Sequence, residues 1–226
     1  MPSRPAVVSR IDRAAEEHVK GLAELGVATV HEAYNRTGLM HGIRPVTGGV
    51  TAGGTAITCL NFAGDNLMLH AAIDIAQPGD MIIVAVTSPS SHGMFGELLA
   101  TSARAHGVTG VVLDAAARDT AELRDMRFPT WARTVSAAGT VKAAPGWVNI
   151  PVSCGGLVVF PGDVVVADDD GVVVVSRADA AEVLENAARR RDREAALRPR
   201  FAAGESSLDT GNLRGMLAPY LQQDEA

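Results

Sequence analysis

The chain carries "GVVLDAAARDTAEL" at residues 110–123, where an apolar strand pattern gives way to a helix pattern at two adjacent opposite charges, Arg118 and Asp119. Neighbouring side chains point in different directions, so these two charges do not form an ion pair along one helix face. The junction after a parallel-type strand is where α/β folds place ligand sites. The stretch therefore indicates an α/β fold with a candidate site at its charged junction.

Composition limits the classes of protein to consider. Hydrophobic residues make up 47% of the 226 residues and charged residues 20%, which is ordinary for a globular protein. The net charge of −6 argues against a general nucleic-acid or anionic-membrane surface. Cys59 and Cys154 lie far apart without metal-ligand spacing, which predicts reduced core thiols. The N-terminal segment is charged, and the longest apolar runs are too short to span a bilayer. We expect a cytoplasmic protein with neither nucleic acid nor membrane as partner.

The first half of the chain reads as mixed helix and strand. Apolar spacing predicts a helix over 9–26 that stops at Gly26, and a short second helix from Thr29 to Gly38. Glycines in the following stretch, 46–60, predict strands in a tight, glycine-turned arrangement. Strand and helix patterns then alternate as far as residue 126, which predicts crossover helices beside a sheet.

The second half is richer in strands and ends in a charged helix. Residues 164–175 predict a β-hairpin that turns at Asp169, Asp170 and Gly171. Residues 179–204 predict a long helix, broken near Pro199, with a narrow apolar stripe. We therefore expect an α/β fold with more than one sheet layer, formed by one domain over 1–177 and a C-terminal helical arm over 178–226.

The residues around the junction allow two interpretations. Asp119 could bind a hard divalent cation such as Mg²⁺, and Arg118 could pair with a substrate oxyanion. Alternatively, Asp119 is the N-cap of a helix over 120–126 and Arg118 is solvated. Gly96 opens another helix pattern, whose free N–H groups could bind a carboxylate. Glu97 could then lie beside the metal or hold its water, or be an ordinary first-turn acid.

Glu97, twenty intervening residues and the pair Arg118-Asp119 together resemble the acid-X20-Arg-Asp signature of class II pyruvate aldolases. These enzymes cleave 4-hydroxy-4-methyl-2-oxoglutarate and 4-carboxy-4-hydroxy-2-oxoadipate, and they share a superfamily with the RraA regulators of ribonuclease E. Similar stretches include "ATVHEAYNRTGLM" (28–40), "AGDNLMLH" (63–70) and "PGDVVVADDDGVVVV" (161–175). The resemblance runs from about residue 20 to at least residue 177.

The resemblance implies a role for each matching residue. Asp119 would bind the metal, Mg²⁺ or Mn²⁺, while Arg118 would contact the pyruvyl oxygens and Glu97 would hold a water of the metal. The backbone of the helix start would bind the substrate carboxylate, through Gly96, Leu98 and Leu99. An acid from the arm of a neighbouring subunit would complete the site, and we assign it to Glu194, with Asp192 and Glu205 as alternatives. Neither of the two lysines, Lys20 and Lys142, is expected in this site.

The resemblance also implies the fold, the assembly and the activity. The fold would be the swivelling β/β/α layered sandwich of RraA-like proteins, in homotrimers or homohexamers with sites between subunits. The activity would be metal-dependent retro-aldol cleavage to pyruvate plus pyruvate or oxaloacetate, with oxaloacetate decarboxylation as a side activity. Two alternatives are a non-catalytic RraA-type regulator that binds an RNA-processing partner, and a dedicated decarboxylase of 2-keto diacids.

Overall fold

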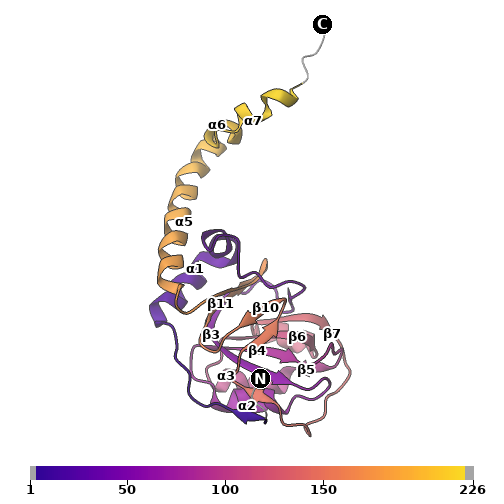
Figure 1. Cartoon of the computed structure of the whole chain (residues 1–226). Helices are drawn as coiled ribbons and strands as arrows, with labels where there is room; N and C mark the ends of the chain where they lie inside the picture. Colours follow the sequence, from indigo (N-terminus) through magenta and orange to yellow (C-terminus); the bar gives the residue numbers. More distant parts are fainter. Residues whose placement is uncertain (1–3, 222–226) are drawn as a thin grey trace. The chain divides into compact units, whose positions relative to one another are not determined.

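Parallel strands form the middle of the main sheet in the computed structural model, which describes residues 4–221. Four of them lie side by side in the order β3 (Ala52–Asn61), β4 (Asp80–Val86), β6 (Gly110–Ala117) and β7 (Thr130–Val135) (Figure 1). Each neighbouring pair is parallel. Parallel neighbours need crossover connections, which contain the helices α2 (Leu67–Ile75), α3 (Glu97–Ala105) and α4 (Thr120–Asp125).

Short strands extend this sheet at both edges. Beyond β3 lie β8 (Trp147–Val148) and β1 (Ala6–Val7), and beyond β7 lies β2 (Arg44–Pro45). The short β5 (Gly93–Phe95) pairs in parallel with the end of β6. Two hairpins complete the strands: β9 (Val152–Cys154) with β10 (Leu157–Val159), and β11 (Val164–Asp168) with β12 (Gly171–Val175). The second hairpin joins the main sheet through β11, which runs antiparallel to β3.

Alternating side chains along each central strand separate two apolar cores. Ile82 and Val84 of β4 pack in the core that holds α2, α3 and α4. Met81 and Ile83 of the same strand pack in the core that holds both hairpins. A strand with apolar residues on both faces is buried between two layers, so the molecule has hairpins on one face of the sheet and helices on the other. This is the expected β/β/α arrangement.

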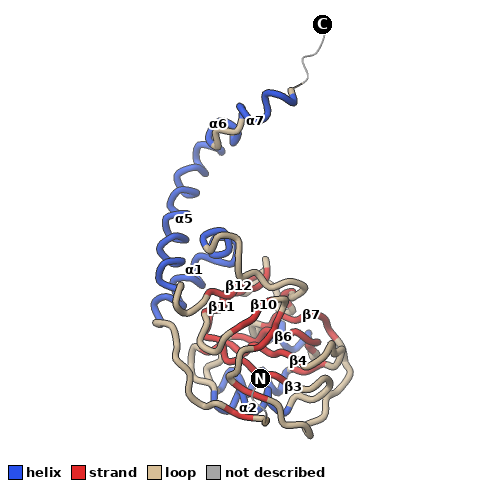
Figure 2. Tube along the Cα trace, in the orientation of Figure 1, coloured by secondary structure: helices blue, strands red, loops and turns tan. Residues whose placement is uncertain are grey.

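A third apolar core lies between the outer face of the β11–β12 hairpin and two helices. These helices are α1 (Glu16–Ala33), which lies beside the hairpin in Figure 2, and the first turns of α5 (Ala180–Ala202). The helix α1 is interrupted at Gly26, whose φ of 77° belongs to the left-handed region that glycine enters readily. The predicted stop at Gly26 is therefore confirmed, although the helix resumes at once rather than at Thr29.

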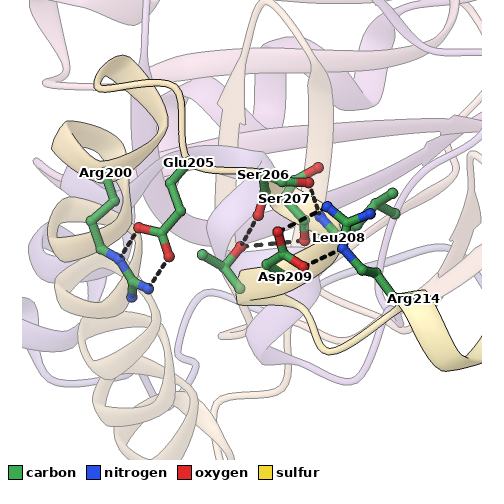
Figure 3. A network of polar contacts seen from close by, with 8 residues as sticks. Arg200, Glu205, Ser206, Ser207, Leu208, Asp209 and Arg214 are labelled. Carbon is green, nitrogen blue, oxygen red and sulfur yellow. Dashed lines mark hydrogen bonds and ion pairs between the residues drawn. The ribbon is translucent and has the colours of Figure 1, made fainter.

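The chain divides into two compact units, residues 1–187 and residues 188–226. The second unit contains most of α5, followed by α6 (Ser207–Thr210), α7 (Arg214–Leu217) and the 3₁₀ turn η1 (Ala218–Tyr220). Within it, Arg200 pairs with Glu205, and Arg214 pairs with Asp209 (Figure 3). These pairs link the end of α5 and the short helix α6 to the segments that follow each of them.

Three details of the predicted elements are wrong. The first helix begins at Glu16 rather than residue 9, because Arg13 forms two 2.9 Å hydrogen bonds to Asp80 and holds the preceding segment against the start of β4. The glycine-rich stretch forms one ten-residue strand, β3, instead of several tightly turned ones. The long helix continues through Pro199 to Ala202. The proline removes one N–H bond to the preceding turn, but only three residues of the helix follow it, so little helix lies beyond the lost bond.

No helix within residues 4–221 is both long enough and apolar enough to cross a membrane.

Candidate functional site

The candidate site lies at the carboxyl ends of the parallel strands. β6 ends at Ala117, so Arg118 and Asp119 follow it directly. β5 ends at Phe95, which is paired with Ala117, and Gly96 comes next. The N–H of Arg118 donates to the carbonyl of Phe95 at 2.9 Å and closes the two strand ends together. Two segments more than twenty residues apart in sequence thus meet at the edge where α/β folds bind ligands.

Asp119 caps a different helix from the one that it precedes in sequence. Its backbone is left-handed (φ 51°, ψ 46°), and its carboxylate forms no capping bond to α4. Instead, Oδ2 accepts hydrogen bonds from the N–H of Glu97 at 3.1 Å and from Nε of Arg118 at 3.3 Å. The side chain therefore points across to the start of α3, and the interpretation of Asp119 as a simple side-chain cap of the following helix is wrong. Non-glycine residues held in this region often mark functional sites.

Gly96 lets the two segments approach. A Cβ atom at this position would lie 2.2 Å from Oδ2 of Asp119, far inside ordinary contact. The φ of Gly96 is −151°, which any residue can adopt, so the glycine is required by the close approach rather than by backbone strain.

The start of α3 presents free hydrogen-bond donors. The N–H groups of Gly96, Leu98 and Leu99 donate to no acceptor in the described part of the chain, whereas the N–H of Glu97 is taken by Asp119. Unpaired N–H groups at a helix N-terminus carry partial positive charge and bind anions. The three predicted carboxylate-binding positions therefore have donors available.

A pocket of about 370 Å³ brings these groups together. A volume of this size suits a small organic acid. The pocket is lined by Asn66, His70, Gly93, Met94, Gly96, Leu98, Leu99, Ser102, Arg118, Asp119, Thr140 and Lys142. A second hollow of about 310 Å³ shares Arg118 and Asp119, and its other walls come from Thr120 and residues 135–137. The two charged residues thus border both hollows.

The carboxylate of Asp119 fits a weakly held divalent cation. Its Oδ1 atom has no hydrogen-bond partner among residues 4–221, and 34% of the side chain is exposed. No cluster of three or more His, Cys, Asp or Glu residues suited to a metal occurs in the same range. A single carboxylate matches Mg²⁺, which keeps several of its waters, and does not match a structural zinc site.

Residues 27–174 match the family model described as "RraA-like: Aldolase/RraA". The chain belongs to the RraA-like family. A curated relative from Halalkalibacterium halodurans, named "Putative 4-hydroxy-4-methyl-2-oxoglutarate aldolase", is 33% identical over 151 residues, which cover 67% of this chain and 72% of the relative. The predicted family is therefore confirmed.

Solved RraA-like structures confirm the fold. An uncharacterized protein from Pseudomonas syringae pv. tomato superposes with a TM-score of 0.77 at 24% identity, over 90% of this chain and 100% of that one. Streptomyces coelicolor RraAS2, described as an unusual member of the RNase ES inhibitor RraA family, gives a TM-score of 0.75 at 27% identity. That match covers 84% of this chain and 99% of the other.

Two predicted residues of this RraA-like site lie outside the pocket lining. Glu97 is half-buried at the first position of α3, and its carboxylate accepts a hydrogen bond from Oγ1 of Thr101 at 3.0 Å. Glu194 lies in the second compact unit and pairs with Arg190 at 2.8 Å. The alternative acids there are paired as well, Asp192 with Arg191 and Glu205 with Arg200. The roles of these acids in a neighbouring subunit's site stay predictions.

The sequence analysis missed five polar residues of the pocket: Asn66, His70, Ser102, Thr140 and Lys142. The expectation that Lys142 lies away from the site is wrong, because contacts between distant segments bring its loop to the pocket. Asn66 and His70 are four residues apart at the start of α2, a spacing that places both on one helix face. Burial, followed by the charge of Lys142, holds the pKa of His70 below its ordinary value.

Proposed function

We propose that this protein is a divalent-metal-dependent pyruvate aldolase, a carbon–carbon lyase. Its substrate is 4-hydroxy-4-methyl-2-oxoglutarate or 4-carboxy-4-hydroxy-2-oxoadipate, cleaved to pyruvate plus pyruvate or oxaloacetate. One observation carries the proposal: an unpaired carboxylate oxygen of Asp119, the guanidinium of Arg118 and the free N–H groups of α3 all border one pocket. The name of the Halalkalibacterium halodurans relative supports the same reaction class.

Retro-aldol cleavage removes the proton of the C4 hydroxyl and breaks the C3–C4 bond. The bonding electrons move to the 2-keto group as a pyruvate enolate, which is then protonated at C3. The free N–H groups of Leu98 and Leu99 hold the C1 carboxylate at the start of α3. The guanidinium of Arg118 stabilises the developing negative charge with a fixed pair of donors. A cation held by Asp119, Mg²⁺ or Mn²⁺, supplies further electrostatic stabilisation to the 2-keto acid.

We assign proton transfer to two acids, Glu97 of this chain and Glu194 of a neighbouring subunit. Glu97 is held by Thr101 at the start of α3, one residue from the N–H groups that bind the substrate. We assign the second acid to Glu194 of a neighbouring subunit in a homotrimer or homohexamer. Oxaloacetate decarboxylation passes through the same enolate, so the same residues support it as a side activity.

Pyruvate release tests the proposal directly. Both substrates are incubated with the protein, first with Mg²⁺ and then after exhaustive chelation by EDTA. Activity is expected to disappear on chelation and to return with Mg²⁺ or Mn²⁺, because one carboxylate holds the cation weakly. Full activity after chelation contradicts the metal dependence.

Two substitutions separate the adjacent charges. Asp119→Asn is expected to lose both metal affinity and turnover, because an amide is a weaker, neutral ligand. Arg118→Lys is expected to keep the metal and lose about 10²-fold in turnover, because an ammonium cannot reproduce the guanidinium fork. Exchange of pyruvate's methyl protons with D₂O reports enolate formation separately. If Arg118→Lys exchanges the methyl protons at the wild-type rate, Arg118 does not stabilise the enolate and is only a surface charge.

Two other activities are alternatives. A non-catalytic regulator of an RNA-processing partner is favoured by the likeness to Streptomyces coelicolor RraAS2, and such a protein would release no pyruvate. A dedicated decarboxylase of 2-keto diacids would release carbon dioxide from oxaloacetate and leave both aldol substrates intact.

A further inference from the structure

The strand that ends at the charged junction contains an extra residue. Leu113 of β6 lies opposite Ala132 of β7, and Ala116 lies opposite Thr134, so β6 advances by three residues where β7 advances by two. A β-bulge of this kind bends the strand that carries it, and bulges beside active sites re-aim side chains. The two charges of the junction follow the end of this same strand.

The bulge sets where the end of β6 lies. Ala117 is opposite Val135 of β7, and the N–H of Ser136 donates to the carbonyl of Ala117 at 2.9 Å. Without the extra residue, Ala117 would lie opposite Ser136, which is a shift of one residue along β7, or about 3.3 Å. A shift of that size would break the 2.9 Å hydrogen bond from the N–H of Arg118 to the carbonyl of Phe95.

The packing around the strand end leaves no room for such a shift. Gly93 of β5 donates its N–H to the carbonyl of Ala138 at 2.8 Å, which fixes β5 to the segment that follows β7. A Cβ atom at Gly93 would lie 2.5 Å from the carbonyl oxygen of Ser136 and 2.9 Å from Cβ of Arg118. The position of Arg118 therefore depends on the register of β6 against both of its neighbours.

One ion pair closes the bulge. Arg133 is the single residue of β7 opposite Asp114 and Ala115, and its Nε donates to Oδ1 of Asp114. Oδ2 of Asp114 accepts from the N–H of Gly155 at 2.9 Å, in the turn between β9 and β10. Only 19% of the Asp114 side chain is exposed. Since a mostly buried charge is costly to leave without its partner, the pair favours the bulged register.

A second ion pair of the main sheet provides a comparison. Arg13 forms two 2.9 Å hydrogen bonds to Asp80, the first residue of β4. Asp80 lies at the start of the parallel strands, at the opposite end from the candidate site. There β4 pairs with β3 and with β6 in unbroken register. The two aspartate–arginine pairs thus share their chemistry and differ in whether a bulge depends on them.

We propose that Asp114 and Arg133 are positioning residues of the candidate site. By closing the bulge of β6, they place Arg118 and Asp119 against the start of α3. The inference rests on the proposed function for its effect on turnover. It extends the groups that turnover requires to two residues that line neither of the hollows at the site.

Backbone hydrogen exchange tests this placement without requiring activity. The N–H groups to follow are those of Arg118 and Glu97, whose hydrogen bonds join the segments of the site. The variant is Arg133→Met. The matched control is Arg13→Met, because each substitution removes the guanidinium from a mostly buried aspartate of the main sheet.

The expected result is a local loss of order at the site. In Arg133→Met, both N–H groups exchange with D₂O about 10- to 100-fold faster, because losing one charged hydrogen bond favours local opening by that factor. Exchange of pyruvate's methyl protons falls about 10-fold or more, and the half-saturating Mg²⁺ concentration rises. That concentration does not depend on the folded fraction of the protein. Arg133→Lys keeps most of both properties, because its ammonium still pairs with Asp114, and Arg13→Met matches the wild type in both.

Two results overturn the positioning role. One is N–H exchange in Arg133→Met that is no faster than in the wild type. The other is equal acceleration in Arg133→Met and Arg13→Met, because the effect would then be a general loss of stability. If Arg133→Met does not fold, Asp114→Asn replaces it, since its amide oxygen still accepts from Gly155 while the charge is lost, and the same acceleration is expected.

Failure of the proposed function gives a different result. A wild-type protein that neither cleaves the two substrates nor exchanges pyruvate protons overturns the proposed function. Faster N–H exchange in Arg133→Met still supports the placement of Arg118 and Asp119 by the ion pair in that case.

Discussion

Replacement of Gly96 by alanine tests whether the closeness of two segments creates the site. The added Cβ would lie 2.2 Å from Oδ2 of Asp119, and ordinary contact begins at 3.4 Å, so the carboxylate must retreat by about 1.2 Å. The 3.1 Å bond from the N–H of Glu97 is then lost. A bond to a charged acceptor contributes about 1.5–3 kcal/mol, and a displacement near 1 Å at a reacting centre can cost about 10²-fold in rate.

We expect Gly96→Ala to fold and to lose most of its catalytic activity. Its φ of −151° accommodates alanine, so the free energy of unfolding falls by no more than about 3 kcal/mol. Pyruvate methyl-proton exchange in D₂O, followed by NMR during a Mg²⁺ titration, is expected to fall about 10²-fold with a weaker apparent metal affinity. Thermal unfolding monitored by circular dichroism measures the change in stability separately.

Gly139→Ala is the matched control, because a Cβ there meets nothing within 4 Å and the residue lies one position from the pocket residue Thr140. The control is expected to match the wild type in both assays. Exchange by Gly96→Ala within twofold of the wild-type rate, at every Mg²⁺ concentration, would refute the reasoning. The carboxylate of Asp119 would then function equally well from a displaced position.

Further predictions concern the loop of Lys142 and the arm. Burial raises the pKa of the Asp65 carboxyl, but hydrogen bonds from the N–H groups of Ala143, Leu67 and Ala144 together lower it below the ordinary value of an aspartate. The stabilisation that the ionised carboxylate gives is therefore fully present above its pKa in the unfolded chain. It is lost as the pH falls through its lower pKa in the folded protein. Asp65→Asn is expected to lower the free energy of unfolding, measured in urea at pH 7, by about 2–4 kcal/mol. The difference in this free energy between variant and wild type should shrink below about pH 4. A difference that does not change with pH would contradict the prediction. Truncation after Ala187 is expected to leave the first unit folded and inactive. Full activity of the truncated chain would show that the arm takes no part in catalysis. Mixing inactive Glu194→Gln subunits with inactive Asp119→Asn subunits is expected to restore turnover, because some mixed sites then combine an intact Asp119 with an intact Glu194.

Local patterns were sufficient to predict the order of elements. The continuous apolar runs of β4 and β6, the break at Gly26 and the turn after Asp168 all depend on residues close in sequence. The charged junction after β6 was predictable for the same reason, because a buried strand that ends in Arg118 and Asp119 is unusual in composition. These features need only periodicity and the conformational preferences of single residues.

Contacts between distant residues account for what the sequence alone did not show. The start of α1 depends on Arg13 meeting Asp80, and the place of Lys142 depends on Asp65 holding a loop 78 residues away. The direction of the Asp119 side chain depends on a left-handed backbone conformation that aspartate adopts only occasionally. No periodic pattern encodes such pairings, because each depends on how several elements pack.

The left-handed backbone of Asp119 bears on how such a chain changes over evolutionary time. Glycine at this position would relieve a strain of about 1–3 kcal/mol while removing the carboxylate that caps α3, whose charged hydrogen bond contributes about 1.5–3 kcal/mol. The two effects nearly offset, and Asp119 belongs to none of the three apolar cores. Selection for stability would thus be almost indifferent to this acid, and under the proposed function only selection for chemistry would retain it. A single substitution at Asp119 would then end the proposed catalysis and leave the three apolar cores, and with them the fold, intact.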